Sequence, residues 1–247
     1  YYSLTARNNY LQNSPSSISY SGFRFGSAVA NINIDTLSGN TIRCNASNSN
    51  YGIYVGQNVN TIGPLAKKYA LFFNNEICIE GKATTSYGLD YNSPNYIDFS
   101  HNTVYINTTG TRYGIHTYNT ATTGSARSYA NIIYMAGTSG SAQCVNHSQG
   151  AANLSPSLID MNNNVYYNEQ GMEIGHGAAS IKAWNALVNN DMNSVWERPS
   201  FISPESYNFH TTGTSAIVNS NPSVPRDKNG IFRSKITNAG CYHDFIP

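Results

Sequence analysis

The sequence predicts an all-β fold, a single-stranded right-handed parallel β-helix of about five to seven coils, on three observations. First, one pattern recurs along most of the 247 residues: an Asn-led apolar strand, followed later by a Gly-led strand. Second, apolar residues alternate within each copy, which is the periodicity of a strand and not of a helix. Third, the copies recur about every 30 residues, the range of architectures that stack one coil on the next.

The Asn-led strands predict where each coil bends. Their Asn residues are spaced by 35, 27, 29 and 32 residues. The five copies are residues 40–44, 75–79, 102–106, 131–135 and 163–167. At a bend between strands, Asn tolerates the left-handed backbone conformation and bonds neighbouring backbone groups. Stacked from coil to coil, the Asn side chains are expected to form a hydrogen-bonded ladder.

The Gly-led strands complete each coil. They are residues 22–25, 52–55, 88–91, 114–117 and 171–174. In one representative coil we expect strands at 96–99, 103–106 and 113–118, with a bend at His101 and Asn102. A β-propeller is the competing architecture, but it needs antiparallel hairpins, and hairpin-turn signals such as Asn229-Gly230 are few.

Alternation also predicts which residues fill the core. One inward column is Ile42, Ile77, Val104, Ile133 and Val165, and another is Phe23, Ile53, Leu89, Ile115, Cys144 and Met172. Cys44 points inward as well, Cys78 points outward, and Cys241 lies in the C-terminal tail. The four cysteines show no metal-ligand spacing. We therefore expect four free thiols that pack as small apolar groups.

Two outward columns are the candidates for function. The first follows the Asn bend and reads Arg43, Cys78, Tyr105, Tyr134 and Tyr166. Its last three members, here called the tyrosine stripe, offer either an aromatic surface for sugar rings or side chains that pack against each other beneath a crossing loop. The packing interpretation is favoured.

The second outward column lies on the Gly-led strands and reads Arg24, Tyr54, Asp90, His116, Val145 and Glu173. Asp90 and His116 are expected to be neighbours on adjacent coils. They are the candidates for catalysis, with the carboxylate orienting an imidazole base. Tyr54, Asp90, His116 and Glu173 are also the candidates for gripping a saccharide. The alternative is a solvated pair that contributes little to stability.

The C-terminal part, residues 176–247, is expected to continue and cap the domain formed by the coils of residues 1–175. Ser180 can N-cap a helix that runs to Val188 with an apolar face. Beyond it, Asp227 and Arg233 are expected to pair across a turn in which Gly230 adopts a positive φ.

A series of short motifs in this part carries a resemblance. They are Arg-Pro-Ser-Phe (198–201), Asn-Phe-His (208–210), Thr-Ser-Ala-Ile (214–217), Asp-Lys-Asn-Gly-Ile-Phe-Arg (227–233) and Ala-Gly-Cys-Tyr (239–242). In order and spacing, the series resembles the closing segment of large secreted or surface β-helix proteins of Bacteroidetes type, within the pectate-lyase-like superfold. Arg198, Ser215 and His243 depart from that pattern. The resemblance implies a secreted or cell-surface location and contact with polysaccharide, but no activity.

Composition excludes some partners. Only 11% of residues are charged and the net charge is +1, which argues against nucleic acid and anionic membranes. No apolar run approaches the ~20 residues of a membrane span. The repeat begins within the first residues, so we expect further β-helix coils N-terminal to this segment in a parent chain, with an aggregation-prone edge where they are missing.

Two functions remain open. A non-catalytic extracellular module, an adhesin or stalk segment that binds glycans weakly, fits the low charge and the lack of a carboxylate cluster. Its partner is a neutral or weakly charged polysaccharide, or another surface protein. The alternative is a polysaccharide lyase or glycoside hydrolase, which needs paired carboxylates, or a base with cations or Ca²⁺. Lys67 and Lys68 are the nearest loop cations, and no acidic cluster supports Ca²⁺, so we expect no cofactor or metal. A tail-spike-like fibre shares the coil and is not tested by the sequence.

Overall fold

The computed structural model describes residues 2–14, 18–26, 32–56, 69–92, 96–118, 126–153, 158–171, 173–212 and 214–244. Its body is a parallel β-solenoid in which the chain passes repeatedly through three sheets, A, B and C. The strand pairs that the structure describes within these three sheets are all parallel. The predicted β-helix of about five coils is therefore confirmed, and the propeller is not formed.

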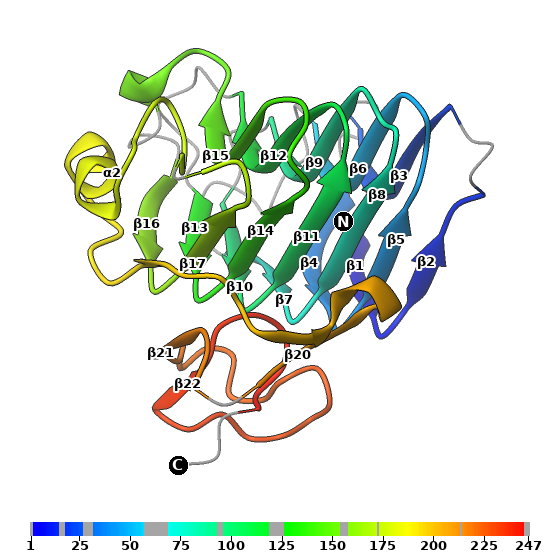
Figure 1. The fold of residues 1–247 in the computed structure, drawn as a ribbon. Coiled ribbons are helices and arrows are strands. Elements are labelled where there is room, and N and C mark those ends of the chain that lie inside the picture. The colour runs from blue at the N-terminus through cyan, green and yellow to red at the C-terminus, as the bar shows by residue number, and fades with distance from the viewer. Residues whose placement is uncertain are drawn as a thin grey trace.

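The first five coils each contribute one strand to each sheet, and successive coils lie side by side from the N-terminal end to the helix α2 (Figure 1). Sheet A contains β1 (Tyr2–Arg7), β4 (Ile32–Ser38), β7 (Ala70–Phe73), β10 (Ile97–Ser100), β13 (Ala126–Tyr129) and β16 (Leu158–Asn162). Sheet B contains β2 (Tyr10–Gln12), β5 (Thr41–Cys44), β8 (Glu76–Gly81), β11 (Thr103–Thr108), β14 (Ile132–Ala136), β17 (Val165–Asn168) and β18 (Val195–Trp196). Sheet C contains β3 (Ser19–Phe25), β6 (Ser49–Val55), β9 (Thr85–Tyr91), β12 (Thr111–Thr117) and β15 (Ala142–His147).

A ladder of Asn side chains runs along the bend between sheets A and B. Its rungs are Asn9, Asn40, Asn75, Asn102, Asn131 and Asn164. At each step, the amide oxygen of one Asn accepts both the backbone N–H and the side-chain N–H of the Asn one coil before it, as Asn102 does from Asn75 at 2.9 Å. The ladder predicted from the sequence is therefore present.

The left-handed backbone conformation falls one residue earlier than predicted. The residues with positive φ at this bend are Asn8, Gly39, Asn74, His101, Ala130 and Asn163. The ladder Asn has a side chain that points along the bend and is buried at every rung except Asn9, while the preceding residue makes the turn. The prediction that one Asn both adopts the left-handed conformation and forms the ladder is therefore corrected: two consecutive residues share these tasks.

The last ladder position also corrects two predicted columns. Three consecutive Asn residues, 162–164, made the repeat ambiguous, and the ladder uses Asn164 where the pattern suggested Asn163. Every following residue is therefore shifted by one position: Tyr166 pairs with Ile133 and faces the core, while Tyr167 pairs with Tyr134. Val165, placed in the core column by the sequence, pairs with Ile132 and is buried on the opposite face.

The strands of sheet C interrupt the alternation of inward and outward side chains at one point. In β6, Gly52 and Ile53 are both buried, whereas Tyr51 and Tyr54 on either side are half-buried. A Cβ built on Gly52 would lie 2.6 Å from the carbonyl oxygen of Gly88 on the next coil, so only glycine fits there. The same pattern in β12 places Tyr113 and His116 on one outer face. Sheet C therefore has two outward columns where the sequence predicted one.

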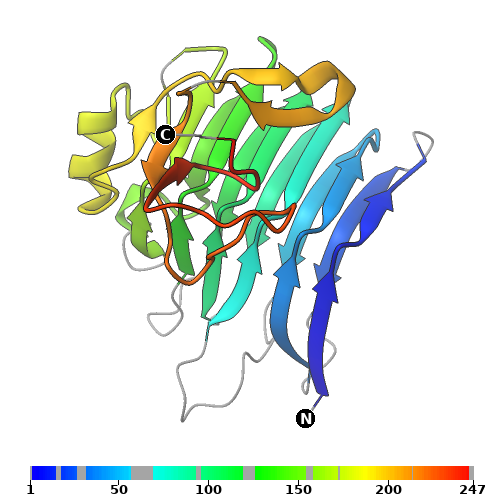
Figure 2. The same cartoon turned by 90° about the horizontal axis from the view of Figure 1, so that it is seen from below.

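The C-terminal part closes one end of the solenoid and then returns across it. Helix α2 (Ile181–Val188) is N-capped by Ser180, whose side chain accepts from Ala183 N at 3.0 Å, as predicted. The chain next forms the antiparallel pairs β19 (Phe201–Ser203) with β20 (Asn208–Thr211) and β21 (Ile217–Asn219) with β22 (Ile236–Asn238). The short 3₁₀ turns are η1 (Ala151–Asn153) and η2 (Pro204–Ser206). We call residues 198–244 the C-terminal segment; it lies across the strands of several coils (Figure 2).

Contacts along the outer side of the bend hold the C-terminal segment in place. Arg233 donates to Asn74 at 3.0 Å, and the amide of Asn221 donates to Nε2 of His101 at 3.1 Å. Asp227, predicted to pair with Arg233, accepts instead from backbone amides, including those of Asn229 and Ile231, while Gly230 has the expected positive φ. A division into domains at residue 175 stays a prediction.

All four cysteines are free and buried, as expected. Cys144 lies in the core, but it aligns with the glycines of sheet C, and Val145 takes the core position beside Ile115. Met172 lies outside the described residues. Burial raises the pKa of the Cys144 thiol, so this group stays protonated and unreactive at neutral pH.

We predict that the ladder is a main source of stability. Asn102→Ala removes an acceptor for two N–H groups and a donor to Asn131 in a fully buried site, so it should lower the free energy of unfolding by about 3 kcal/mol or more. Asn9→Ala, at the exposed end rung, should cost under about 1 kcal/mol. Urea denaturation followed by circular dichroism compares the two variants. Equal losses would show that the ladder adds nothing specific.

We also predict that acid loosens the C-terminal segment. Burial, with Arg233 nearby, holds the pKa of His101 well below 6.5, and burial lowers the pKa of His243 as well. The docked state thus binds fewer protons than the detached state. Docking is then fully stable above pH 6.5 and weakens as the pH falls below that value.

Hydrogen exchange of residues 226–244 between pH 7.5 and 5.5 measures this effect, and exchange should rise several-fold beyond the intrinsic change. His101→Asn should reduce that pH dependence, because Asn occupies the same left-handed position at Asn8, Asn74 and Asn163. Identical pH dependence in the variant and the parent would contradict the role of His101.

Candidate functional site

Two members of the tyrosine stripe, Tyr105 and Tyr134, do not form an open surface. Tyr105 and Tyr134 are only 6% and 4% exposed. The reason is a long-range one: the β19–β20 pair crosses sheet B and packs Phe209 on Tyr105 and Phe201 on Tyr134, with ring centroids 5.2 and 5.9 Å apart. Tyr166 faces the core. The favoured alternative, packing beneath a crossing segment, describes the first two tyrosines.

Further along the same face, a buried ionic cluster fixes the C-terminal segment to sheet B. Glu76 is 2% exposed and forms an ion pair with Arg43 and another with Lys228 at 3.6 Å. The Tyr242 hydroxyl donates to the same carboxylate. Arg43, Lys228 and Tyr242 all bind the carboxylate of Glu76. We therefore assign this cluster a structural role, the attachment of the C-terminal segment to sheet B.

Asp90 and His116 lie together on sheet C, as predicted. They are register partners on β9 and β12, and Nδ1 of His116 lies 2.8 Å from Oδ1 of Asp90. Both side chains are 12% exposed. The carboxylate places the imidazole proton on Nδ1, which leaves Nε2 as an acceptor. The pair can therefore position a hydroxyl group or act as a base.

The rest of this column differs in part from the prediction. Tyr54 belongs to it, and Arg24 stacks over the Tyr54 ring at 4.4 Å. Beyond His116 the partner is Asn146, because Val145 turns inward. Glu173 follows one coil later, but it accepts from Gln143 at 3.0 Å rather than from Asn146.

Sheet C carries a second outward column, which was not predicted from the sequence. Tyr51, Tyr87 and Tyr113 form what we call the tyrosine stack, with ring centroids 4.9 and 5.5 Å apart and interplanar angles of 6° and 30°. His116 lies 5.1 Å from the Tyr113 ring at 29°. The available signal was a Tyr directly before the Gly in three consecutive copies.

An open cleft of about 630 Å³ adjoins the end of this stack. It is lined by Tyr87, Tyr113, His116, Tyr118, Asn146, His147, Ser148, Gly150 and His176. This volume falls within the roughly 300–1,000 Å³ of small-ligand sites. Burial lowers the pKa of His176 and raises that of Tyr87, so both groups are uncharged at neutral pH.

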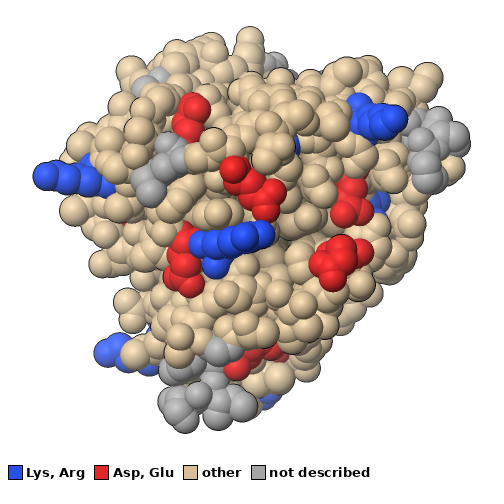
Figure 3. All heavy atoms as spheres, in the orientation of Figure 1, with Lys and Arg blue, Asp and Glu red and all other residues tan. Residues whose placement is uncertain are grey.

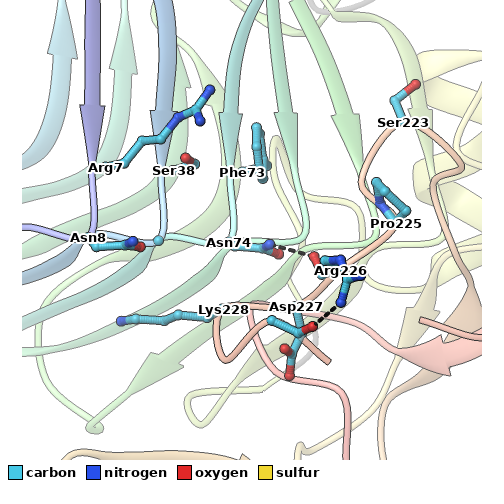
Figure 4. Close-up of a pocket in the computed structure, with 12 residues that line it drawn as sticks. Arg7, Asn8, Ser38, Phe73, Asn74, Ser223, Pro225, Arg226, Asp227 and Lys228 are labelled. Carbon is cyan, nitrogen blue, oxygen red and sulfur yellow. Dashed lines mark hydrogen bonds between the residues drawn. The ribbon is translucent and has the colours of Figure 1, made fainter. Parts of the chain in front are cut away.

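A second hollow, of about 430 Å³, lies beneath the C-terminal segment at the bend (Figure 4). Its walls include Arg7, Phe73 and Pro225. Two polar side chains here already have partners within the fold: Asn74 donates to the carbonyl of Arg226 at 2.7 Å, and Arg226 donates to that of Gly230 at 2.7 Å. We therefore regard it as a packing gap under a crossing loop.

Charge is sparse on the face drawn in Figure 3, where acidic and basic side chains are scattered among uncharged residues. Within the described ranges, no group of three or more His, Cys, Asp or Glu residues is arranged to hold a metal ion. No helix in the part of the chain that the structure describes is long and apolar enough to cross a membrane. Lys67 and Lys68, the loop cations considered for a lyase, lie outside the described residues.

Comparison of the chain with protein-family models, curated proteins and solved structures finds no match. The parallel β-solenoid is therefore established by the structure alone. The likeness to Bacteroidetes-type surface proteins, and the further coils expected before this segment, stay predictions.

Proposed function

We propose that this chain is a non-catalytic extracellular or cell-surface module, a segment of an adhesin or stalk, that binds glycans weakly through sheet C. The observation that supports this most directly is the tyrosine stack beside the Asp90–His116 pair, next to a cleft of about 630 Å³. Aromatic rings pair with the apolar faces of sugars, while imidazole, amide and hydroxyl groups bond sugar hydroxyls.

The location of the C-terminal segment favours sheet C over sheet B. Its aromatic residues cover the outer side of sheet B, and its polar contacts lie along the bend and on sheet B. Sheet C carries no comparable aromatic contacts from this segment among the described residues. The low overall charge and the many uncharged polar residues are typical of surface proteins that contact carbohydrate.

A second candidate function is a polysaccharide-acting enzyme, and the 2.8 Å contact between Asp90 and His116 is what favours it. His116 would be the base, with Asp90 orienting it. A lyase also needs positive charge at the substrate carboxylate. Among the described residues of this column, the cation is Arg24, which lies three coils from His116 and is stacked on Tyr54. A hydrolase needs a second carboxylate near the bond that is cleaved.

We predict binding without turnover. Glycan arrays and titration calorimetry should detect a polysaccharide ligand with a dissociation constant near 1 mM, about −4 kcal/mol. Asp90→Ala and His116→Ala should each weaken binding about five- to tenfold, since each removes roughly 1 kcal/mol of hydrogen bonding or orientation. Asp160→Ala, an exposed carboxylate on sheet A, is the matched control and should have no effect.

Reducing-end and unsaturated-product assays on pectin, alginate and neutral polysaccharides test the competing function. Turnover that disappears in Asp90→Ala or His116→Ala would overturn the non-catalytic proposal. If no glycan binds, the glycan-binding proposal fails and a purely structural stalk remains.

A further inference from the structure

The tyrosine stack ends at the fourth coil. Its column continues on β15 with Gln143, the register partner of Tyr113, so a fourth ring does not follow. Gln143 is not free to move into the cleft, because it donates to Glu173 at 3.0 Å and accepts from Asn146. Tyr113 therefore ends the row of rings, and the cleft opens beside it.

Hydrogen bonds fix the proton positions on two histidines of the cleft. His116 has its proton on Nδ1, facing Asp90, and presents Nε2 as an acceptor. His176 accepts the backbone N–H of His147 on Nε2 at 3.0 Å, so its neutral ring carries the proton on Nδ1 as a donor. Asn146 donates its amide to Gln143 and keeps its carbonyl oxygen as an acceptor.

The lining of the cleft is uncharged. Its described residues supply aromatic, imidazole, amide and hydroxyl groups, and none of them is Lys, Arg, Asp or Glu. Two carboxylates are bonded to groups in or beside the cleft: Asp90 is hydrogen-bonded to His116, and Glu173 accepts from the Gly177 amide at 3.4 Å. Among the described residues, an anionic ligand would meet these two carboxylates and no lining cation.

We propose that this cleft binds one uncharged pyranose ring, packed against Tyr113 and His116, with its hydroxyls bonded to His116 Nε2, His176 Nδ1–H and Asn146. The proposal rests on the function proposed above and names the ligand class and the binding position. A pyranose fits because it pairs an apolar face with hydroxyls that both donate and accept, and the cleft offers ring surface, acceptors and a donor. The carboxylates of Asp90 and Glu173 disfavour a uronic acid at this position.

The experiment compares methyl galactopyranoside, methyl glucopyranoside and methyl galacturonoside by saturation-transfer NMR and NMR titration. At least one neutral glycoside should bind, and the galacturonoside should bind at least tenfold more weakly. Tyr113→Ala and His176→Ala should each weaken binding of the neutral glycoside about tenfold. Tyr51→Ala, at the far end of the same stack and outside the cleft, should change it less than twofold.

Tyr113→Phe keeps the aromatic ring and should bind the neutral glycoside like the parent. If Tyr113→Ala does not fold, His176→Ala still tests the site. Equal effects of Tyr51→Ala and Tyr113→Ala would overturn the proposal, as would equal binding of the galacturonoside. If a polysaccharide binds but neither neutral glycoside does, the single-ring site is wrong while glycan binding by sheet C stands. If nothing binds, both proposals fail.

Discussion

The Asn ladder at the bend between sheets A and B is the constraint on which the other features of the solenoid depend. Each buried rung satisfies one backbone and one side-chain N–H of the coil before it, so a one-residue slip would leave several buried polar groups without partners. The last rung donates to Asp191, which also accepts from Tyr166 and Trp184 at 2.8 and 2.7 Å. A carboxylate with acceptor oxygens only is suited to end a ladder that terminates in donors.

A fixed register places like residues above one another on every outer face. Columns repeat at the strand spacing of about 4.8 Å, which is close to the stacking distance of aromatic rings. This fixed register aligns tyrosines on both sheet B and sheet C, but the rings pack differently on the two sheets. On sheet B the rings meet edge to face, with Tyr105 and Tyr134 at 84°, and are covered by Phe201 and Phe209. On sheet C the rings are nearly parallel and half-buried.

Local pattern was enough to predict the strands, the ladder and the Ser180 cap, because each depends on residues within one repeat and on its spacing. It failed at residues 162–164, where three consecutive Asn residues fit the pattern equally and only stacking on Asn131 decides among them. It also missed the tyrosine stack, because strict alternation does not anticipate two consecutive inward residues at Gly52 and Ile53. The cover on sheet B could not be predicted, since Phe209 meets Tyr105 about a hundred residues earlier in the chain and no periodicity encodes that contact.

The chemistry of sheet C bears on which function suits this fold. An open cleft buries only part of a ligand, and its few polar groups come from neutral side chains, so binding at one site is weak. Weak sites are effective when the ligand repeats along a polymer or the protein is displayed in many copies, because a second contact then forms at high effective concentration. Catalysis requires more than weak contact with the ligand. A base such as His116 accelerates a reaction effectively when a second group stabilises the charge that develops in the transition state. Asp90 is already bonded to His116 and cannot serve as that second group. Repeated weak contact with a polysaccharide is therefore the use that we propose for this arrangement of side chains.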